Sequence, residues 1–456
     1  MRTKCTRWIV SAGVLLAAGA AAWAQDGGAV ELDRRYIDTL NGFSLRPPAE
    51  VERKREFSAS RIVYWQKRDP KTNAIAWTLS VLRAAESNEN IDLAPYSKAL
   101  AEKLQKNNDY KISSTELGKV GDKPAILFAG VTGGSIQWWQ RQSWVLVEPG
   151  RFLVFAMAGP EDSKANLDKI YSEVLGTVQF SDPKEIKAQR EKNLGRGQEL
   201  LAGLTRERIA AALVTGPQWF LMRMKDKDVG FMSQNEAMVS NKGDDGFEIT
   251  VWVMLEIPKD QPRLMKQVLF ATPNGLLERW KQQLQVGSGN QSQVVAEDGS
   301  RINEMVVCNI QHDDKIDTRK KVVPKIPLPP NMSKDVYLPR AIGFLLPRLV
   351  DLSKAGSYGF AVYTSEANDF DLRTFTVYGL EKATLAGKEV QAFRATDQVA
   401  ADAEPATLWL DDKGRLLQMS TPDGLVVQPA TKAQVTAAFP NAEAVIKGMQ
   451  QWANQP

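Results

Sequence analysis

Very few residues of this 456-residue chain could take part in nucleophilic chemistry. The sequence holds one histidine, His312, and two cysteines, Cys5 and Cys308. A Ser-His-Asp or Cys-His system would therefore have to use His312. Cys308 and His312 are four residues apart, so on a strand they share a face but lie about 13 Å from each other, too far to pair. We predict no nucleophilic catalysis, and a surface position for His312.

Metal binding has equally little support in the sequence. Zinc needs several histidine or cysteine ligands, whereas calcium needs only oxygen ligands. The best local oxygen group is Asn368, Asp369 and Asp371, followed by Asp226 and Asp228. Neither has the full spacing of a calcium loop, and both are typical of turns. We therefore predict no metal and no cofactor.

The residues best suited to binding are aromatic. Trp138 and Trp139 are consecutive on a strand-like run and must point to opposite faces, so at least one should be exposed beside Arg141. Trp252 and Trp280 belong to apolar strand patterns and could line a concave sheet. Core packing is the favoured alternative for each tryptophan. The candidate contacts for a ligand or partner are Trp138, Trp139, Arg141, Trp252 and Trp280.

Residues 1–24 have the pattern of a secretory signal peptide. Three basic residues and no acid precede an apolar stretch at 8–22, and Ala22-Trp23-Ala24 matches the small residues that signal peptidase needs. The apolar run is shorter than the roughly 20 residues of a membrane span. We expect cleavage after Ala24 and export by the Sec route, to a periplasm or out of the cell.

Cleavage would change the chemistry of the chain. It would remove Cys5 and three of the 58 basic residues, leaving 55 basic against 54 acidic residues. Such a balance argues against nucleic acid or an acidic membrane surface as the main partner. The remaining thiol, Cys308, has no intrachain disulfide partner, and its apolar run is typical of a buried, inert cysteine. No later segment is predicted to span a membrane.

Hydrophobic periodicity divides the mature chain. Residues 25–182 alternate strand patterns with two helices, one at 94–107 and one after Ser163. Residues 183–214 are charged and helical in pattern, and we interpret them as an interdomain linker. Residues 215–430 are rich in strand patterns.

Three details of the second half bear on its fold. Residues 276–284 fit a strand and also fit one face of a helix. A short helix is predicted at 339–352, cut by Pro347. Residues 431–456 should form terminal helices, the first begun by a Thr431/Gln434 capping box. The predicted class is α+β, with an N-terminal antiparallel sheet flanked by helices, a helical linker, and a large curved antiparallel β-sheet domain with short terminal helices.

The element order of residues 25–182 resembles the PsbP/Mog1-like group, which includes DcrB-type envelope lipoproteins. The residues that carry the resemblance are the opening Gly42–Pro48, the Tyr96–Leu104 helix, Lys123-Pro124-Ala125, the Trp144–Val147 and Phe152–Ala158 hairpin, and the closing Val178–Ser181. The resemblance implies an antiparallel sheet with helices on its faces and a binding or assembly role. It implies no catalytic residue.

Residues 215–430 resemble the curved sheets of envelope proteins similar to the lipoprotein carrier LolA. Trp219-Phe220 with Val229-Gly230-Phe231 matches an opening hairpin, and Leu408–Leu417 matches a closing one. Sheets of this kind wrap an apolar ligand. We therefore expect an exported, non-catalytic envelope or periplasmic protein that binds an apolar ligand or lipid. The alternatives are a scaffold or assembly factor for another envelope protein, and a hydrolase that uses acidic residues only.

Overall fold

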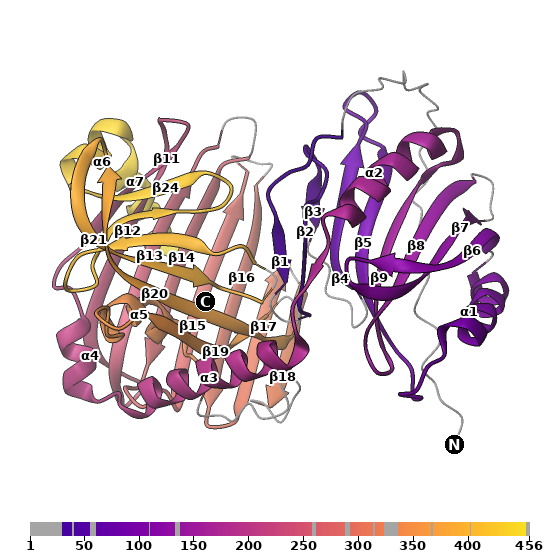
Figure 1. The fold of residues 1–456 in the computed structure, drawn as a ribbon. Helices are drawn as coiled ribbons and strands as arrows, with labels where there is room; N and C mark the ends of the chain where they lie inside the picture. Colours follow the sequence, from indigo (N-terminus) through magenta and orange to yellow (C-terminus); the bar gives the residue numbers. More distant parts are fainter. Residues whose placement is uncertain are drawn as a thin grey trace. The chain divides into compact units, whose positions relative to one another are not determined.

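The chain folds into two compact units, Met1–Ile186 and Lys187–Pro456 (Figure 1). The computed structural model describes residues 30–452 except 39–40, 55–60, 109, 133–136, 258–260, 288–291, 313–314, 323–335, 366–367 and 402. The predicted signal peptide and the proline-rich stretch 324–330 lie outside the described residues. Both units combine antiparallel sheets with helices, which confirms the predicted α+β class.

The first unit is built on a seven-stranded antiparallel sheet. Its strands, in spatial order, are β3 (Glu52–Lys54), β4 (Arg61–Arg68), β5 (Ile75–Ala85), β9 (Arg151–Pro160), β8 (Trp138–Glu148), β7 (Lys123–Thr132) and β6 (Tyr110–Val120). A second, three-stranded sheet contains β1 (Tyr36–Asp38), β2 (Phe43–Leu45) and β10 (Gln179–Phe180).

Helices cover both faces of the seven-stranded sheet. Alternate residues of β9 enter two separate cores, because successive side chains on a strand point to opposite faces. Phe152 and Val154 pack with α1 (Leu93–Asn108). Leu153 and Phe155 pack with α2 (Lys164–Gly176) and with the small sheet.

The second unit is built on a 14-stranded antiparallel sheet. The first half runs in the order β18 (Lys315–Val322), β17 (Met305–His312), β16 (Gln293–Ile302), β15 (Leu277–Val286), β14 (Arg263–Ala271), β13 (Asp244–Leu255), β12 (Lys227–Asn241) and β11 (Gln218–Met224). The second half continues with β24 (Leu425–Ala430), β23 (Leu416–Ser420), β22 (Ala406–Leu410), β21 (Lys388–Gln398), β20 (Asp369–Leu385) and β19 (Gly356–Thr364).

The large sheet is strongly curved, and its two ends approach each other (Figure 1). On β18, Arg319 donates from Nη1 to the carbonyl oxygen of Ser365, which follows β19. Lys321 of the same strand lies 3.3 Å from Asp369 at the start of β20. The sheet therefore has a concave inner face and a convex outer face.

The helix α5 (Arg340–Leu349) packs on the inner face. Phe247 and Ile249 of β13 share one buried cluster with Ile342 and Leu345 of this helix. The outer face is covered in part by α6 (Lys432–Ala438) and α7 (Ala442–Trp452). Val435 of α6 packs with the outward-facing residues of β12 and β13. The predicted capping box of Thr431 and Gln434 is present at the start of α6.

The predicted linker belongs largely to the second unit. Its residues form α3 (Pro183–Ala202) and α4 (Arg206–Ala212). Leu200, Leu204 and Ile209 lie in the same buried cluster as α5. From Lys187 onward this segment therefore belongs to the second unit. No helix in the described part of the chain is both long enough and apolar enough to cross a membrane.

The prediction that Pro347 cuts its helix is wrong, because α5 continues through Pro347 to Leu349. Proline lacks the N–H that would bond the carbonyl four residues earlier, which belongs to Gly343. Arg373 Nη2 donates to that carbonyl at 3.2 Å. A Cβ on Gly343 would collide with the Arg373 guanidinium, so glycine permits the approach.

Candidate binding site on the inner face of the sheet

The inner face carries a row of apolar side chains that solvent reaches. The row crosses five neighbouring strands, β12 to β16, and each member lies directly opposite the next in the antiparallel register. All five are partly exposed although they face inward. Neighbouring strands are about 4.8 Å apart, so the row extends over about 19 Å, on the scale of a long alkyl chain. We call it the apolar row: Met232, Val253, Met265, Leu284 and Val295.

The position of α5 explains why this row is exposed while others are not. Farther along the same strands, Leu269 and Trp280 also face inward, but they are only 2% and 1% exposed. They lie in the cluster that contains Ile342 and Leu345 of α5. The helix therefore covers one end of the inner face, and the apolar row lies toward the other end.

A pair of glutamines lies between the apolar row and the helix-covered end. Gln267 and Gln282 are directly opposite each other on β14 and β15, and both are partly exposed. Gln267 Nε2 donates to Gln282 Oε1 at 2.6 Å. Within the described residues, the remaining amide atoms of the pair, Gln267 Oε1 and Gln282 Nε2, bond no protein atom. Whichever way the two amides are oriented, the NH₂ group of one glutamine and the carbonyl oxygen of the other stay available beside the apolar row.

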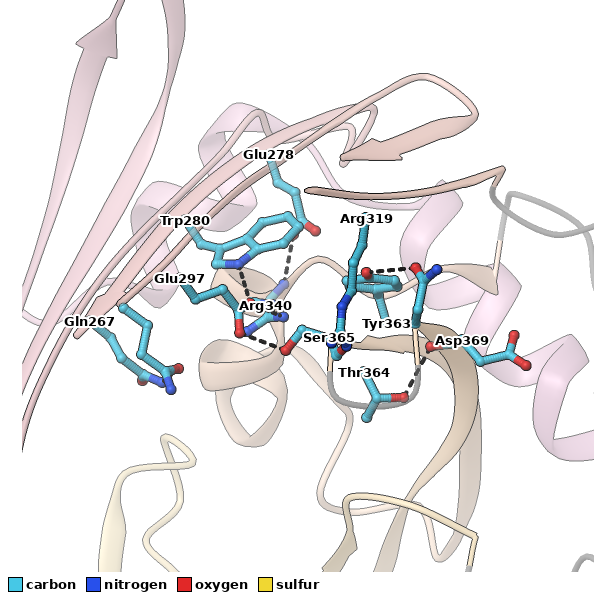
Figure 2. Close-up of polar contacts among 12 residues, drawn as sticks. Gln267, Glu278, Trp280, Glu297, Arg319, Arg340, Tyr363, Thr364, Ser365 and Asp369 are labelled. Carbon is cyan, nitrogen blue, oxygen red and sulfur yellow. Dashed lines mark hydrogen bonds and ion pairs between the residues drawn. The ribbon is translucent and has the colours of Figure 1, made fainter. Parts of the chain in front are cut away.

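Next to this amide pair lies a polar cluster centred on Glu297 (Figure 2). Glu297 Oε1 accepts hydrogen bonds from Trp280 Nε1 at 2.6 Å and from Arg340 Nη2 at 2.9 Å. Its Oε2 accepts from Ser365 Oγ at 2.5 Å. The Arg340 guanidinium also lies 4.4 Å from the centre of the Trp280 ring, a cation–π contact. Glu297 thus ties two strands, α5 and the turn after β19 together.

Glu278 anchors the first turn of α5. The side chain is buried, and its two oxygens accept from the Tyr337 hydroxyl and, at 2.9 Å, from the backbone N–H of Arg340. A carboxyl group is favourably placed at a helix N-terminus, where unpaired N–H groups point outward. Burial nevertheless raises the pKa of Glu278, against the opposing effects of the Tyr337 hydrogen bond and the Arg340 charge.

Glu236 anchors the last turn of the same helix. Its carboxylate forms a bidentate pair with Arg348, with Nη1 to Oε2 at 2.8 Å and Nη2 to Oε1 at 2.6 Å. The backbone N–H of Val214 and the amides of Gln218 and Gln234 also donate to it. Burial disfavours the ionised form, but the Arg348 hydrogen bonds and charge outweigh it and lower the pKa of Glu236.

These buried carboxylates fit anchoring better than acid–base catalysis. Both oxygens of Glu236, Glu278 and Glu297 accept from protein donors, and each group contacts α5. A catalytic acid or base needs an oxygen within reach of a substrate proton. The arrangement therefore places a group of buried carboxylates, held by protein hydrogen bonds and arginine charges, beside a partly exposed apolar row.

Cys308 lies in the same interior and has the environment of an inert thiol. It is fully buried, and burial together with the Glu297 charge raises the pKa of the thiol to about 12. Since the thiolate is the reactive form, we predict that iodoacetamide labels Cys308 in the folded chain without residues 1–24 at least a hundredfold more slowly than in urea. Labelling followed by mass spectrometry measures the two rates. Equal rates would show that the thiol is accessible.

The structure brings Trp139 and Arg141 together, but they pack against α2 and do not form an exposed binding surface. Trp139 is 4% exposed, and its Nε1 donates to Asp168 Oδ1 of α2 at 3.0 Å. Arg141 Nη1 bonds the same oxygen at 3.2 Å. Trp138 is partly exposed and points to the opposite face of the sheet, as predicted for consecutive strand residues. The three residues therefore do not form one contact surface.

Trp252 and Trp280 lie on opposite faces of the large sheet. Trp280 points inward and belongs to the Glu297 cluster. Trp252 alternates with Val251, which points inward, so it lies on the outer face, where it is 7% exposed. Only Trp280 is near the apolar row, and it lies under α5.

The apolar row and the amide pair are the features that the sequence interpretation missed. Their signal is present in β15, where Glu278, Trp280, Gln282 and Leu284 occupy alternate positions and share the inner face. This stretch is a strand, so the helical alternative for 276–284 does not hold. The residues that lie beside these on the other strands follow only from the strand register, which no pattern in the sequence specifies.

The polar residues considered for chemistry are placed as follows. His312 ends β17 opposite Val295, and its side chain lies outside the described residues. Asp369 pairs with Lys321, and Asp371 Oδ1 accepts the backbone N–H of Leu372 at 2.7 Å. In the residues that the structure describes, no three histidine, cysteine or acidic side chains gather as they would around a metal ion.

The first unit carries a hollow of about 410 Å³ beside α2. Its apolar wall includes Trp77, Leu167 and Ile170. Its lysine, Lys67, pairs with Glu50 at 3.0 Å, so the charge is already neutralised. The hollow opens to the surface, and within the described residues its lining includes none of the buried side chains that have a polar atom without a hydrogen-bond partner. We therefore place the binding proposal in the second unit.

Comparisons with known proteins yield structural likeness only. No protein-family model and no curated protein matches the chain. A β-barrel-like protein of a domain of unknown function, DUF1849, from Brucella abortus is 13% identical, with a TM-score of 0.34, over 48% of this chain and 97% of that one. The cyanobacterial PsbP of Synechocystis sp. PCC 6803 is 16% identical, with a TM-score of 0.27, over 36% of this chain and 100% of that one.

Proposed function

We propose that this chain is an exported, non-catalytic protein that binds an elongated apolar ligand, such as the hydrocarbon chain of a lipid. The ligand lies along the apolar row on the inner face of the 14-stranded sheet. The resemblances to Mog1-like and LolA-like proteins are part of this proposal, since such folds serve binding and carriage. A scaffold role through Trp138 and Trp139 has less support, because Trp139 is buried.

The observation that carries the proposal is the partial exposure of the apolar row at inward-facing positions. Inward positions of a curved sheet are ordinarily filled by other side chains, as they are under α5. Met232 and Val253 pack against the buried cluster that contains Phe220 and Met222, so the row continues the core and remains in contact with solvent. An alkyl chain on this row would be removed from water along its length.

Replacing Leu284 by glutamate tests this function. An ionised carboxylate in the row would lose hydration when a ligand covers it and would have no paired cation there. We predict that Leu284→Glu weakens binding of the neutral fluorescent probe N-phenyl-1-naphthylamine at least tenfold, or about 1.4 kcal/mol. Fluorescence titration of the full mature chain measures the affinity.

The neighbouring Gln285 supplies the matched control, because it lies on the outer face of the same strand. Gln285→Glu introduces the same charge one residue away and should bind the probe as the unaltered protein does. Thermal melting shows whether both variants are folded. Absence of saturable probe binding in the unaltered protein, or equal weakening by both substitutions, would reject the proposal.

A further inference from the structure

We propose that the ligand is a neutral single-chain amphiphile whose uncharged polar end reaches the Gln267–Gln282 pair while its alkyl chain follows the apolar row toward the rim. This inference rests on the proposed function and specifies the ligand's chemistry. Three features of the inner face support it: the available amide groups, the paired charges beside them, and the position of the amides between the apolar row and α5.

The glutamine pair is suited to a group that both donates and accepts one hydrogen bond. The Gln267–Gln282 bond of 2.6 Å uses one N–H and one carbonyl, and leaves a donor and an acceptor side by side. A hydroxyl or a carboxamide satisfies both, whereas an ionised carboxylate only accepts. A carboxylate here would leave the glutamine carbonyl without a donor, which is costly once the bound ligand has displaced water from the pair.

The charges near the pair are already neutralised. Glu297 is the cross-strand neighbour of Gln282, and Arg340 holds it at 2.9 Å. On the other side, Gln267 lies opposite Val251, which is apolar. An anionic head group would therefore lose its hydration without gaining an unpaired cation at this depth.

The order of residues along each strand sets the orientation. On β14, Arg263 lies at the strand end, Met265 in the apolar row and Gln267 in the amide pair, all at inward-facing positions. A molecule that enters from this end meets the apolar row before the amides. Its polar end must lead, and its chain then occupies the apolar row behind it.

The opposite orientation has its own prediction. If the chain entered first, the polar end would remain at the rim, near the exposed Arg263. An anionic amphiphile would then be preferred, and the preference would depend on Arg263. The two orientations are thus separated by the charge of the preferred ligand.

Competition between dodecanol and dodecanoate for bound N-phenyl-1-naphthylamine tests the inference at pH 7.5 with the full mature chain. We expect dodecanol to displace the probe at a concentration at least tenfold lower than dodecanoate. In Gln267→Leu/Gln282→Leu this ratio should fall below threefold. Gln283→Leu, on the outer face of β15, should keep the tenfold ratio.

The outcomes separate this inference from the proposed function. If the unaltered protein binds the probe but prefers dodecanoate, and Arg263→Gln removes that preference, the chain enters first and the inference is wrong. If it binds both ligands equally, or if the glutamine substitutions leave the ratio unchanged, the amide pair does not select the head group. If the double variant no longer binds the probe, the competition is repeated with the single variant Gln282→Leu. The inference then requires that the preference for dodecanol over dodecanoate falls below threefold in this variant. Failure of the unaltered protein to bind the probe would instead reject the proposed function.

Discussion

Glutamine in place of Glu236 is expected to lower the free energy of unfolding of the second unit by about 3–5 kcal/mol at pH 7. The Glu236 side chain is fully buried and Arg348 is 9% exposed, so the substitution leaves an arginine buried without its counter-charge. One carboxylate oxygen also becomes an amide N–H₂ that faces N–H donors. Urea unfolding of the full chain, read at the transition of the second unit, measures the loss.

The pH dependence of this loss provides an independent check. The pKa of Glu236 is lowered from 4.5 in the folded state, so its stabilisation is complete above about pH 5 and is lost as the pH falls through the folded value. The difference between the unaltered chain and Glu236→Gln should therefore shrink below pH 4.5. Burial raises the pKa of Glu278, which acts in the opposite direction, but this group is common to both proteins and cancels.

Glu248 is a matched control for this substitution. It lies on the adjacent strand β13, points to the outer face and is partly exposed. Glu248→Gln should change stability by no more than about 0.5 kcal/mol, as is usual for surface positions. A difference between Glu236→Gln and the unaltered protein that stays constant down to pH 3 would mean that the Arg348 pair is not the source of the effect.

Alanine at Gly299 is expected to destabilise the second unit by about 3 kcal/mol. Gly299 lies directly opposite Trp280, and a Cβ there would overlap the indole ring. The ring has little freedom to move, because its Nε1 bonds Glu297 and the Arg340 guanidinium covers its face. Displacing the indole would also remove one of the donors that hold Glu297.

The same mechanism predicts strong coupling between the two positions. Trp280→Leu should cost much less in the presence of Gly299→Ala than alone, because the smaller side chain makes room for the added methyl group. Gly448→Ala in α7 is the control, since a Cβ there meets no atom within 4 Å and alanine favours the helix. Additive effects of Gly299→Ala and Trp280→Leu in urea unfolding would contradict the steric explanation.

Local sequence patterns predicted the elements whose formation depends on residues close to one another in the sequence. Alternation on β15 and the Thr431/Gln434 capping box are both short-range patterns, and both are present. The prediction that the helix is cut at Pro347 was wrong. The Gly343 carbonyl, which proline leaves without a helical N–H donor, accepts a hydrogen bond from Arg373, 30 residues away in the sequence. A proline next to such a donor no longer ends a helix.

The candidate site depends on pairings that are distant in the sequence. Glu236 and Arg348 are 112 residues apart, and the pairing of Glu297 with Ser365 spans 68 residues. No periodicity within one element specifies these partners. The apolar row likewise requires the register of five strands, because a shift by one residue would turn each side chain to the other face. The sequence therefore indicated a curved sheet but not what its inner face holds.

The most direct test of ligand binding on the inner face is methyl NMR of methionine-labelled protein titrated with dodecanol. Met232 and Met265 belong to the apolar row, whereas Met254 is buried on the outer face. Single methionine-to-leucine variants assign the signals. We predict saturable shifts at Met232 and Met265 with Met254 unchanged. Unchanged Met232 and Met265 signals at dodecanol concentrations that displace the fluorescent probe would contradict binding at the apolar row.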